Sequence, residues 1–424
     1  MLATADAAIV RSDPAITGLA LVLDPEALAD RLRVARPGAD LTSARAHYVR
    51  YKPGTSCLVG LELEVGGRWV PAFAKAYRRD DRSKLVKAAD RRSSAGLTVF
   101  ETELVVVGGT ADDRDLHLPS RLAHPGSRRQ VLCSLLPGEP DLWEAMPRCL
   151  RYKPERRWVG LVERSGEPVA LMKGYRRGGL TRARAGLRFA STIPLAAPRL
   201  MGSSTRAGAL ASSWLPGAPL SKLGGGGAGS AGDFSEVGQV LAALHAQPAG
   251  HLAPSPAVYD AEAIIAAAAA VSAVAPDLDA TVTRLGRTLA HCLVAGSVAM
   301  TPRHGDFSPD QVIVGAPGVA FIDFDRAGVG DPAADLGQFV ATLELEALRG
   351  GSNAGTLDGR TGELLGGYRS AAGRAASERI DLHVAASLVR LAVEPFRLRW
   401  PDWPAATEAL LDRALALTPM ASRP

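Results

Sequence analysis

Two carboxylates in the last third of the chain have the types and spacing that phosphoryl transfer requires. Asp306 follows a histidine and a glycine, and Asp323 ends a short apolar run farther along, with the amide side chain of Gln311 between them. A carboxylate in the first position can accept the proton of a substrate hydroxyl. A carboxylate and an amide carbonyl can hold the Mg²⁺ that neutralises nucleotide phosphates. The segment therefore predicts a phosphoryl-transfer site, with Asp306 as the base and Gln311 and Asp323 as metal ligands.

The residues between these side chains predict how they are positioned. Residues 311–314 and 319–322 are short apolar runs separated by a turn of glycine, alanine and proline. This pattern favours a β-hairpin, which would bring both acids to one end. The alternative is that both acids are ordinary loop residues. For His304 we expect a structural role, bracing the loop.

The segment 304–336 resembles the aminoglycoside phosphotransferase and choline kinase family, which shares the protein-kinase-like fold. The resemblance rests on the H-G-D triplet, the I-D-F run, and the G-D-P and D-L motifs that follow. It implies the same roles for the two acids, and it implies that Asp331 and Asp335 brace the loop and shape the substrate pocket. Gln311 stands where the family has asparagine, which keeps the carbonyl ligand but adds a methylene.

The first half of the chain repeats three landmarks in the same order. The matched pairs are residues 50–53 with 151–154, 75–79 with 173–177, and 136–138 with 215–217. In each copy a strand enters a Lys-Pro turn, a second strand follows, and a third strand carries a lysine. This order is that of the small lobe of a kinase-like fold.

We therefore predict an α+β, protein-kinase-like bilobal fold, in which a small antiparallel-sheet lobe is present twice and a mainly helical large lobe follows. The predicted segments are an N-terminal helical extension at 1–39, a first small-lobe copy acting as cap or scaffold at 40–147, a second, nucleotide-binding copy at 148–220, and the large lobe with the catalytic and metal-binding loops at 221–424.

The second copy is the better candidate for the nucleotide because it directly precedes the large lobe. We expect Lys173 to contact the phosphates, and Leu215 and Gly217 to cross the hinge beneath the base. One observation opposes this assignment: no Asp or Glu occurs between Lys173 and Gly217, although kinase-like sites normally orient this lysine with a carboxylate. The alternative, that Lys75 of the first copy contacts the phosphates, stays open.

Periodic apolar residues predict the helices of the large lobe. They are expected over residues 235–245, 261–273, 278–294, 333–348, 362–376, 381–398 and 405–417, with a loop over 350–359.

Composition narrows the class of protein. The net charge is +5 and the arginines are spread along the chain without a groove-reading motif, so we expect no nucleic-acid partner. The four cysteines show no metal-ligand spacing, which predicts reduced thiols. We find no signal peptide and no apolar run long enough to cross a membrane, and we expect a cytoplasmic protein without membrane contact.

These observations predict an ATP- or GTP-dependent phosphotransferase that uses Mg²⁺ and adds phosphate to a hydroxyl of a small polar molecule. Sugars, aminoglycosides or aminocyclitols, and amino alcohols all fit the resemblance. The alternative is a kinase-like nucleotide-binding or regulatory module without catalysis. Gln311 and the missing acid near Lys173 favour that alternative, and the presence of both Asp306 and Asp323 opposes it.

Overall fold

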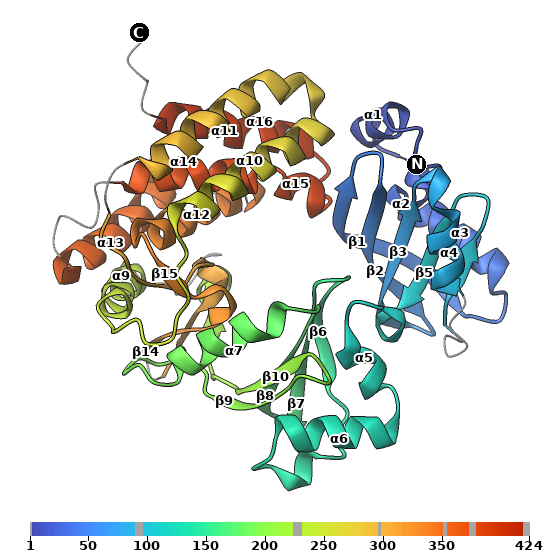
Figure 1. Cartoon of the computed structure of the whole chain (residues 1–424), viewed down its shortest axis with the longest axis horizontal. Helices are drawn as coiled ribbons and strands as arrows, with labels where there is room; N and C mark the ends of the chain where they lie inside the picture. The colour runs from blue at the N-terminus through green and yellow to red at the C-terminus, as the bar shows by residue number, and fades with distance from the viewer. Residues whose placement is uncertain are drawn as a thin grey trace. The chain divides into compact units, whose positions relative to one another are not determined.

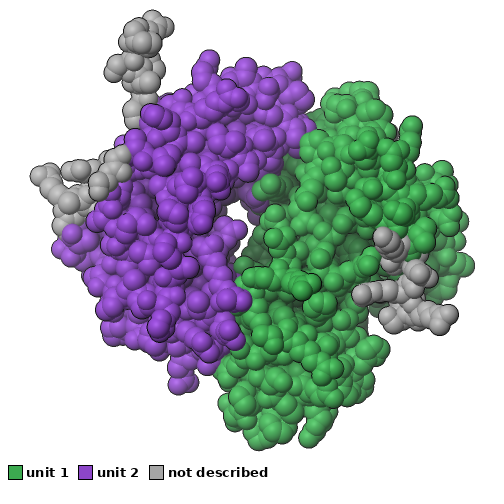
Figure 2. Space-filling model, in the orientation of Figure 1, with its two compact units in different colours: residues 1–180, 201–211, 395–404 green, residues 181–200, 212–394, 405–424 purple. Residues whose placement is uncertain are grey.

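The structure is a computed structural model that divides into two compact units (Figures 1 and 2). It describes residues 2–89, 96–223, 231–295, 298–316, 318–350, 354–372 and 379–418. Unit 1 comprises residues 1–180, 201–211 and 395–404, and unit 2 comprises residues 181–200, 212–394 and 405–424.

Unit 1 contains two five-stranded sheets with matching strand order, β1-β2-β3-β5-β4 and β6-β7-β8-β10-β9 (Figure 1). The strands of the first sheet are β1 (Leu41–Lys52), β2 (Ser56–Val65), β3 (Arg68–Tyr77), β4 (Thr98–Phe100) and β5 (Val105–Gly109). The strands of the second are β6 (Arg148–Lys153), β7 (Arg157–Arg164), β8 (Glu167–Tyr175), β9 (Leu200–Ser204) and β10 (Ala209–Ser213). The shared order confirms the prediction that the small lobe is present twice.

Each sheet is preceded by a pair of helices. These pairs are α2 (Leu19–Leu23) with α3 (Pro25–Ala35), and α5 (His117–Leu122) with α6 (Pro125–Leu135). The L-P-G triplet at 136–138 therefore follows α6 and comes before the second sheet, whereas the triplet at 215–217 comes after that sheet. The third landmark match was wrong, because Pro-Gly pairs end helices and form turns in many contexts.

Equivalent hydrogen bonds mark the start of each copy. Asp13 Oδ2 accepts hydrogen bonds from Tyr51 Oη at 2.7 Å and from the Gly54 backbone N–H at 2.8 Å. Asp113 Oδ2 likewise accepts from Tyr152 Oη at 2.8 Å and from the Glu155 backbone N–H at 2.7 Å. We therefore propose that the copies begin before their helices, near these two aspartates, instead of at residues 40 and 148.

The two copies share one hydrophobic core in unit 1. It contains Leu58 and Phe73 of the first sheet and Trp158 and Met172 of the second. Burial of this much apolar surface holds the sheets together as one body.

The segment 395–404 also belongs to unit 1. The buried carboxylate of Asp6, on α1 (Thr4–Ser12), accepts hydrogen bonds from Arg399 Nη2 at 2.5 Å and from Trp403 Nε1 at 3.2 Å. These hydrogen bonds thus hold α1 against a segment near the C-terminus.

Unit 2 is mainly helical. Its helices are α7 (Gly179–Ala190, from residue 181), α8 (Leu220–Leu223), α9 (Ala231–His245), α10 (Ala257–Val274), α11 (Asp279–Val294), α12 (Ala333–Gly350), α13 (Ala354–Ala372), α14 (Ile380–Leu391) and α16 (Trp403–Leu417, from residue 405). Its strands are β11 (Ala218–Pro219), β12 (Thr301–Arg303), β13 (Val312–Gly315), β14 (Gly318–Phe321) and β15 (Gly328–Gly330). The mixture of antiparallel sheets and helices confirms the predicted α+β class.

The loop predicted over 350–359 was wrong, because α13 already begins at Ala354. Helix α13 packs closely on α9. A Cβ at Gly238 would lie 2.1 Å from the Leu364 carbonyl oxygen, and a Cβ at Gly367 would lie 2.0 Å from the Ser235 carbonyl oxygen. This packing overrides the low helix propensity of the glycines near the start of α13.

Among the described residues, α10 is long and apolar enough by composition to cross a membrane, with a mean hydropathy of 1.6. The prediction that no such run exists was therefore wrong. The helix extends the alanine-rich run toward the N-terminus, and core helices of soluble proteins pass the same test.

Candidate functional site

Strand pairing brings the two predicted loops together in unit 2. Strand β12 pairs antiparallel with β15, with Arg303 opposite Gly328. Gly305, which follows β12, has φ of +80°, and a Cβ there would lie 2.2 Å from the Arg326 carbonyl oxygen. Only glycine fits this close approach. The Asp306 carboxylate consequently lies 3.9 Å from Arg326 Nε.

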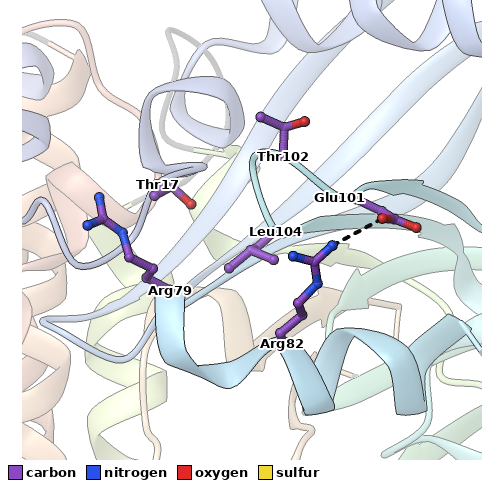
Figure 3. A pocket seen from close by; sticks show the side chains of 6 residues that line it. All are labelled: Thr17, Arg79, Arg82, Glu101, Thr102 and Leu104. Atoms are coloured by element: carbon purple, nitrogen blue, oxygen red, sulfur yellow. Dashed lines mark hydrogen bonds and ion pairs between the residues drawn. The ribbon is translucent and has the colours of Figure 1, made fainter.

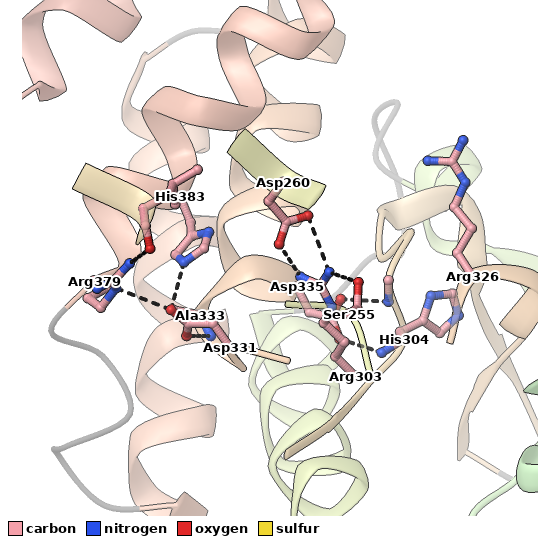
Figure 4. Close-up of polar contacts among 12 residues, drawn as sticks. Ser255, Asp260, Arg303, His304, Arg326, Asp331, Ala333, Asp335, Arg379 and His383 are labelled. Atoms are coloured by element: carbon pink, nitrogen blue, oxygen red, sulfur yellow. Dashed lines mark hydrogen bonds and ion pairs between the residues drawn. The ribbon is translucent and has the colours of Figure 1, made fainter. Parts of the chain in front are cut away.

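Asp335 holds the loop that carries Asp306. Its carboxylate accepts hydrogen bonds from the backbone N–H groups of His304, at 2.6 Å, and Gly305, at 2.9 Å (Figure 4). The fully buried His304 ring donates from Nε2 to the Ile322 carbonyl oxygen at 2.8 Å, which ties this loop to the one carrying Asp323. The predicted bracing role of His304 is confirmed, and so is that of Asp335.

A buried histidine also binds the Asp335 carboxylate. His245 Nε2 donates to Asp335 at 3.2 Å, and His245 Nδ1 lies 2.8 Å from Tyr368 Oη. Burial acts to raise the pKa of Asp335, but the hydrogen bond from His245 and electrostatic interactions with His245, His304 and Arg303 together lower the pKa below its usual value. The brace is therefore a charged carboxylate whose oxygens are all used for positioning.

The predicted hairpin is confirmed and fixes the two candidate metal ligands. Strands β13 and β14 pair from Val312 with Phe321 to Gly315 with Gly318, and the Ile322 N–H donates to the Gln311 carbonyl oxygen at 2.9 Å. Asp323 follows directly, with φ of +66°. A left-handed conformation is costly for a residue with a Cβ, and such strain often marks functional positions.

The donor set at the hairpin fits Mg²⁺. Gln311 and Asp323 offer only oxygen atoms, which Mg²⁺ prefers, and Mg²⁺ commonly uses one or two carboxylates with phosphates and water. No group of three or more His, Cys, Asp or Glu side chains able to hold a metal occurs in the described part of the chain. That excludes a site made only of such side chains there, and leaves room for a metal shared with a nucleotide.

Helix α7 lies directly on the loop that follows Asp323. A Cβ at Gly186 would lie 1.9 Å from the Phe324 carbonyl oxygen, and Arg182 Nη2 donates to the Arg326 carbonyl oxygen at 2.8 Å. This helix occupies the place in the chain where a carboxylate was expected, and it presents arginine to the loop instead.

The expected hinge residues lie beside the hairpin. Gly217 has φ of +131°, and a Cβ there would lie 2.6 Å from the Val314 carbonyl oxygen. It leads into β11, which pairs with β13, whereas Leu215 is partly buried just before it. Unit 2 thus contains the predicted base, metal ligands and hinge residues on neighbouring segments.

The two candidate lysines belong to unit 1 and differ in their surroundings. Lys173 on β8 is buried, with 7% of its surface exposed. Lys75, at the equivalent place on β3, donates from Nζ to Glu155 Oε1 at 2.6 Å. Glu155 also pairs with Arg50, and it belongs to the turn between β6 and β7 of the second copy. Lys75 therefore already has a structural counter-ion.

A cavity of about 360 Å³ on the first copy is unrelated to these side chains (Figure 3). Its lining includes Thr17, Arg79 and Leu104, together with an Arg82–Glu101 ion pair of 3.3 Å. None of the predicted catalytic, metal or nucleotide residues lines it.

The sequence analysis did not predict the arginines near Asp306. Besides Arg326, the charges of Arg182 and of Arg390, on α14, act on the Asp306 region. Arg326 could have been suspected, because it directly follows the I-D-F-D run. The other two are distant in sequence and belong to no motif.

A model of the phosphotransferase enzyme family matches residues 154–374, which is more than half of the chain. The chain belongs to the phosphotransferase enzyme family. The match covers strands β7 to β10 of the second sheet and the site of this phosphotransferase, and it begins after the first sheet and β6.

Solved structures that resemble this phosphotransferase are distant in sequence. A choline/ethanolamine kinase family protein from Mesorhizobium loti has 16% identity and a TM-score of 0.49, over 69% of this chain and 94% of that one. A choline kinase from Cryptosporidium parvum has 13% identity and a TM-score of 0.47, over 68% and 94%. An aminoglycoside phosphotransferase, APH(3'')-Id, from Streptomyces rimosus has 19% identity and a TM-score of 0.44, over 59% and 95%. No characterised protein matches the sequence itself significantly.

Proposed function

We propose that the protein transfers the γ-phosphoryl group of ATP or GTP to a hydroxyl of a small polar molecule in the cytoplasm. Asp306 is the proposed base, Gln311 and Asp323 the metal ligands, Lys173 the phosphate-binding lysine, and Leu215 with Gly217 the hinge. The arrangement that carries the proposal is the fixed juxtaposition of the loops of Asp306 and Asp323, held by the Gly305–Arg326 contact and the His304–Ile322 hydrogen bond. The four cysteines form no disulfide, which suits a reducing compartment.

The chemistry requires little from the protein beyond positioning and charge. The acceptor oxygen forms a bond to the γ-phosphorus as the bond to the β–γ bridging oxygen breaks, and the acceptor proton passes to Asp306. A bound Mg²⁺ would supply positive charge to the phosphates. Asp335, through the backbone N–H groups of His304 and Gly305, keeps Asp306 in place during this step.

Replacing the base tests the mechanism. Asp306→Asn should lower kcat by about 10²- to 10⁴-fold, because general-base positioning contributes about that much, while nucleotide affinity stays nearly unchanged. The assay follows nucleoside diphosphate release over a panel of sugars, aminocyclitols and amino alcohols. Asp310→Asn, which alters an exposed acid nearby, is the matched control. Full turnover by Asp306→Asn on a substrate of the wild type would contradict the mechanism.

The same assay separates the enzyme from a binding module without catalysis. The module is favoured by Gln311 in the asparagine position and by the absence of an acid between Lys173 and Gly217. Stabilisation by Mg·ATP without turnover, on a panel that also includes acidic acceptors, would support the module instead of the enzyme.

A further inference from the structure

Three arginines from three segments interact electrostatically with the carboxylate of Asp306. Arg326 Nε lies 3.9 Å from it, and both side chains are substantially exposed. Arg182 reaches the same loop from α7 through its 2.8 Å hydrogen bond to the Arg326 carbonyl oxygen, and it too is exposed. Two of the three cations are thus fixed to one loop and accessible to a ligand.

Arg390 approaches from α14. It lies two helical turns after His383, on the same face of the helix. His383 Nε2 donates to Asp331 at 2.8 Å, so this face is directed toward the segment that carries the site (Figure 4). The charges that act on Arg390 are those of Arg326, Asp306, Asp260 and Arg303, and the same four groups act on Arg182.

Among the groups that act on one another here, arginines outnumber carboxylates. Arg303 is occupied, because its guanidinium binds Asp260 at 2.9 and 3.2 Å and Ser255 at 2.6 Å (Figure 4). Of the two carboxylates in this set, Asp260 is bound to Arg303, which leaves Asp306 to balance Arg182, Arg326 and Arg390. Burial, and next the charge of Arg326, lower the pKa of Arg390. Among the described residues Arg390 forms no hydrogen bond or ion pair.

A partly buried cation beside other cations is costly unless a ligand anion completes the site. An acceptor with several ammonium groups would meet repulsion from all three arginines, whereas a carboxylate or phosphate would gain charge-assisted hydrogen bonds. The nucleotide is a less suitable ligand for these arginines, because they interact with Asp306, the base that touches the acceptor.

Resting on the proposed function, we propose that the acceptor is a small hydroxyl compound that itself carries an anionic group, bound by Arg390 and Arg182 beside Asp306. A sugar acid and a sugar phosphate share this chemistry.

Four acceptors with the same ring and different charge test the proposal: glucose, glucosamine, glucuronate and glucose 6-phosphate. The wild type should use an anionic member with a kcat/KM at least about tenfold above that of glucose, the value of one charge-assisted hydrogen bond. Comparison of glucuronate with glucose 6-phosphate distinguishes a carboxylate from a phosphate. Equal or better use of glucose or glucosamine would overturn the proposal and leave the phosphotransferase function intact.

Variants assign the effect to the arginines. Arg390→Gln and Arg182→Gln should each raise KM for the anionic acceptor about tenfold and leave KM for the nucleotide within about twofold. Arg287→Gln, an exposed arginine of α11, should change neither. Arg390→Gln should not lower the melting temperature of the free enzyme, because it removes an unneutralised cation. A raised KM for the nucleotide alone would assign these arginines to the nucleotide and overturn the proposal.

If the enzyme turns over none of the four acceptors, ligand binding tests the proposal instead. With saturating Mg·ADP, glucuronate or glucose 6-phosphate should raise the melting temperature of the wild type more than that of Arg390→Gln. No rise with either anion would overturn the inference. Failure of Mg·ADP itself to stabilise the protein would instead count against the proposed function.

Discussion

Two lysines at equivalent places in two copies of one lobe illustrate how a residue can keep its type and change its role. Lys75 and Lys173 both lie on the third strand of their sheets. The Lys75 ammonium is engaged by Glu155 and lies 5.1 Å from the centre of the Tyr77 ring. Its charge is therefore used within unit 1, which agrees with a scaffold role for the first copy.

We predict different effects on nucleotide binding for the two lysines. Lys173→Met should weaken Mg·ADP binding about tenfold or more, as expected for loss of a charge-assisted contact, whereas Lys75→Met should change it less than about twofold. Isothermal titration calorimetry measures both. A large loss only in Lys75→Met would reverse the assignment of the two copies.

At the scale of elements, hydrogen bonds and ion pairs bind the turn between β6 and β7 to the first copy. Its residue Glu155 accepts from Lys75 and Arg50, and its backbone N–H donates to Asp113. In a kinase-like lobe this turn covers the phosphates. The first copy thus holds this turn of the second copy in place.

We predict that this tie stabilises unit 1 and depends on pH. Burial acts to raise the pKa of Glu155, but Lys75 and then Arg50 lower it below its usual value. The stabilisation is therefore present above about pH 4.3 and is lost as the pH falls below that value. Glu155→Gln should cost about 2 kcal/mol at pH 7, measured by urea unfolding, and should flatten the decline in stability as the pH falls below about 4.3.

A double-mutant cycle provides the control for this pair. Because Lys75 and Glu155 are in contact, the effects of Lys75→Met and Glu155→Gln should not be additive. Additivity within about 0.3 kcal/mol would show that the ion pair contributes nothing to stability.

At the scale of the whole molecule, sequence reasoning succeeded where the information is local. The loop of Asp306 and the hairpin before Asp323 lie within one short segment, and its turn residues and apolar runs determine their shape. Repeated landmarks were enough to show the duplicated lobe. The comparison of landmarks failed at residues 136–138, because the Pro-Gly pair there follows the end of α6 and does not form a hinge.

Contacts between segments that are distant along the chain could not be predicted from the sequence. The Lys75–Glu155 pair and the gathering of Arg182 and Arg390 near Asp306 depend on tertiary packing that no local pattern encodes. The same holds for Arg399, which reaches Asp6 at the other end of the chain. Such pairs are visible only once the fold is known.

Metal binding tests the central claim, that the loops of Asp306 and Asp323 form one phosphoryl-transfer site, without knowledge of the acceptor. Electron paramagnetic resonance with Mn²⁺ in place of Mg²⁺, in the presence of ADP, reports the ion bound to the enzyme. We predict that the wild type and Asp306→Asn bind Mn²⁺ with the nucleotide, and that Asp323→Asn loses this signal while remaining folded. Undiminished Mn²⁺–nucleotide binding by Asp323→Asn would contradict the account.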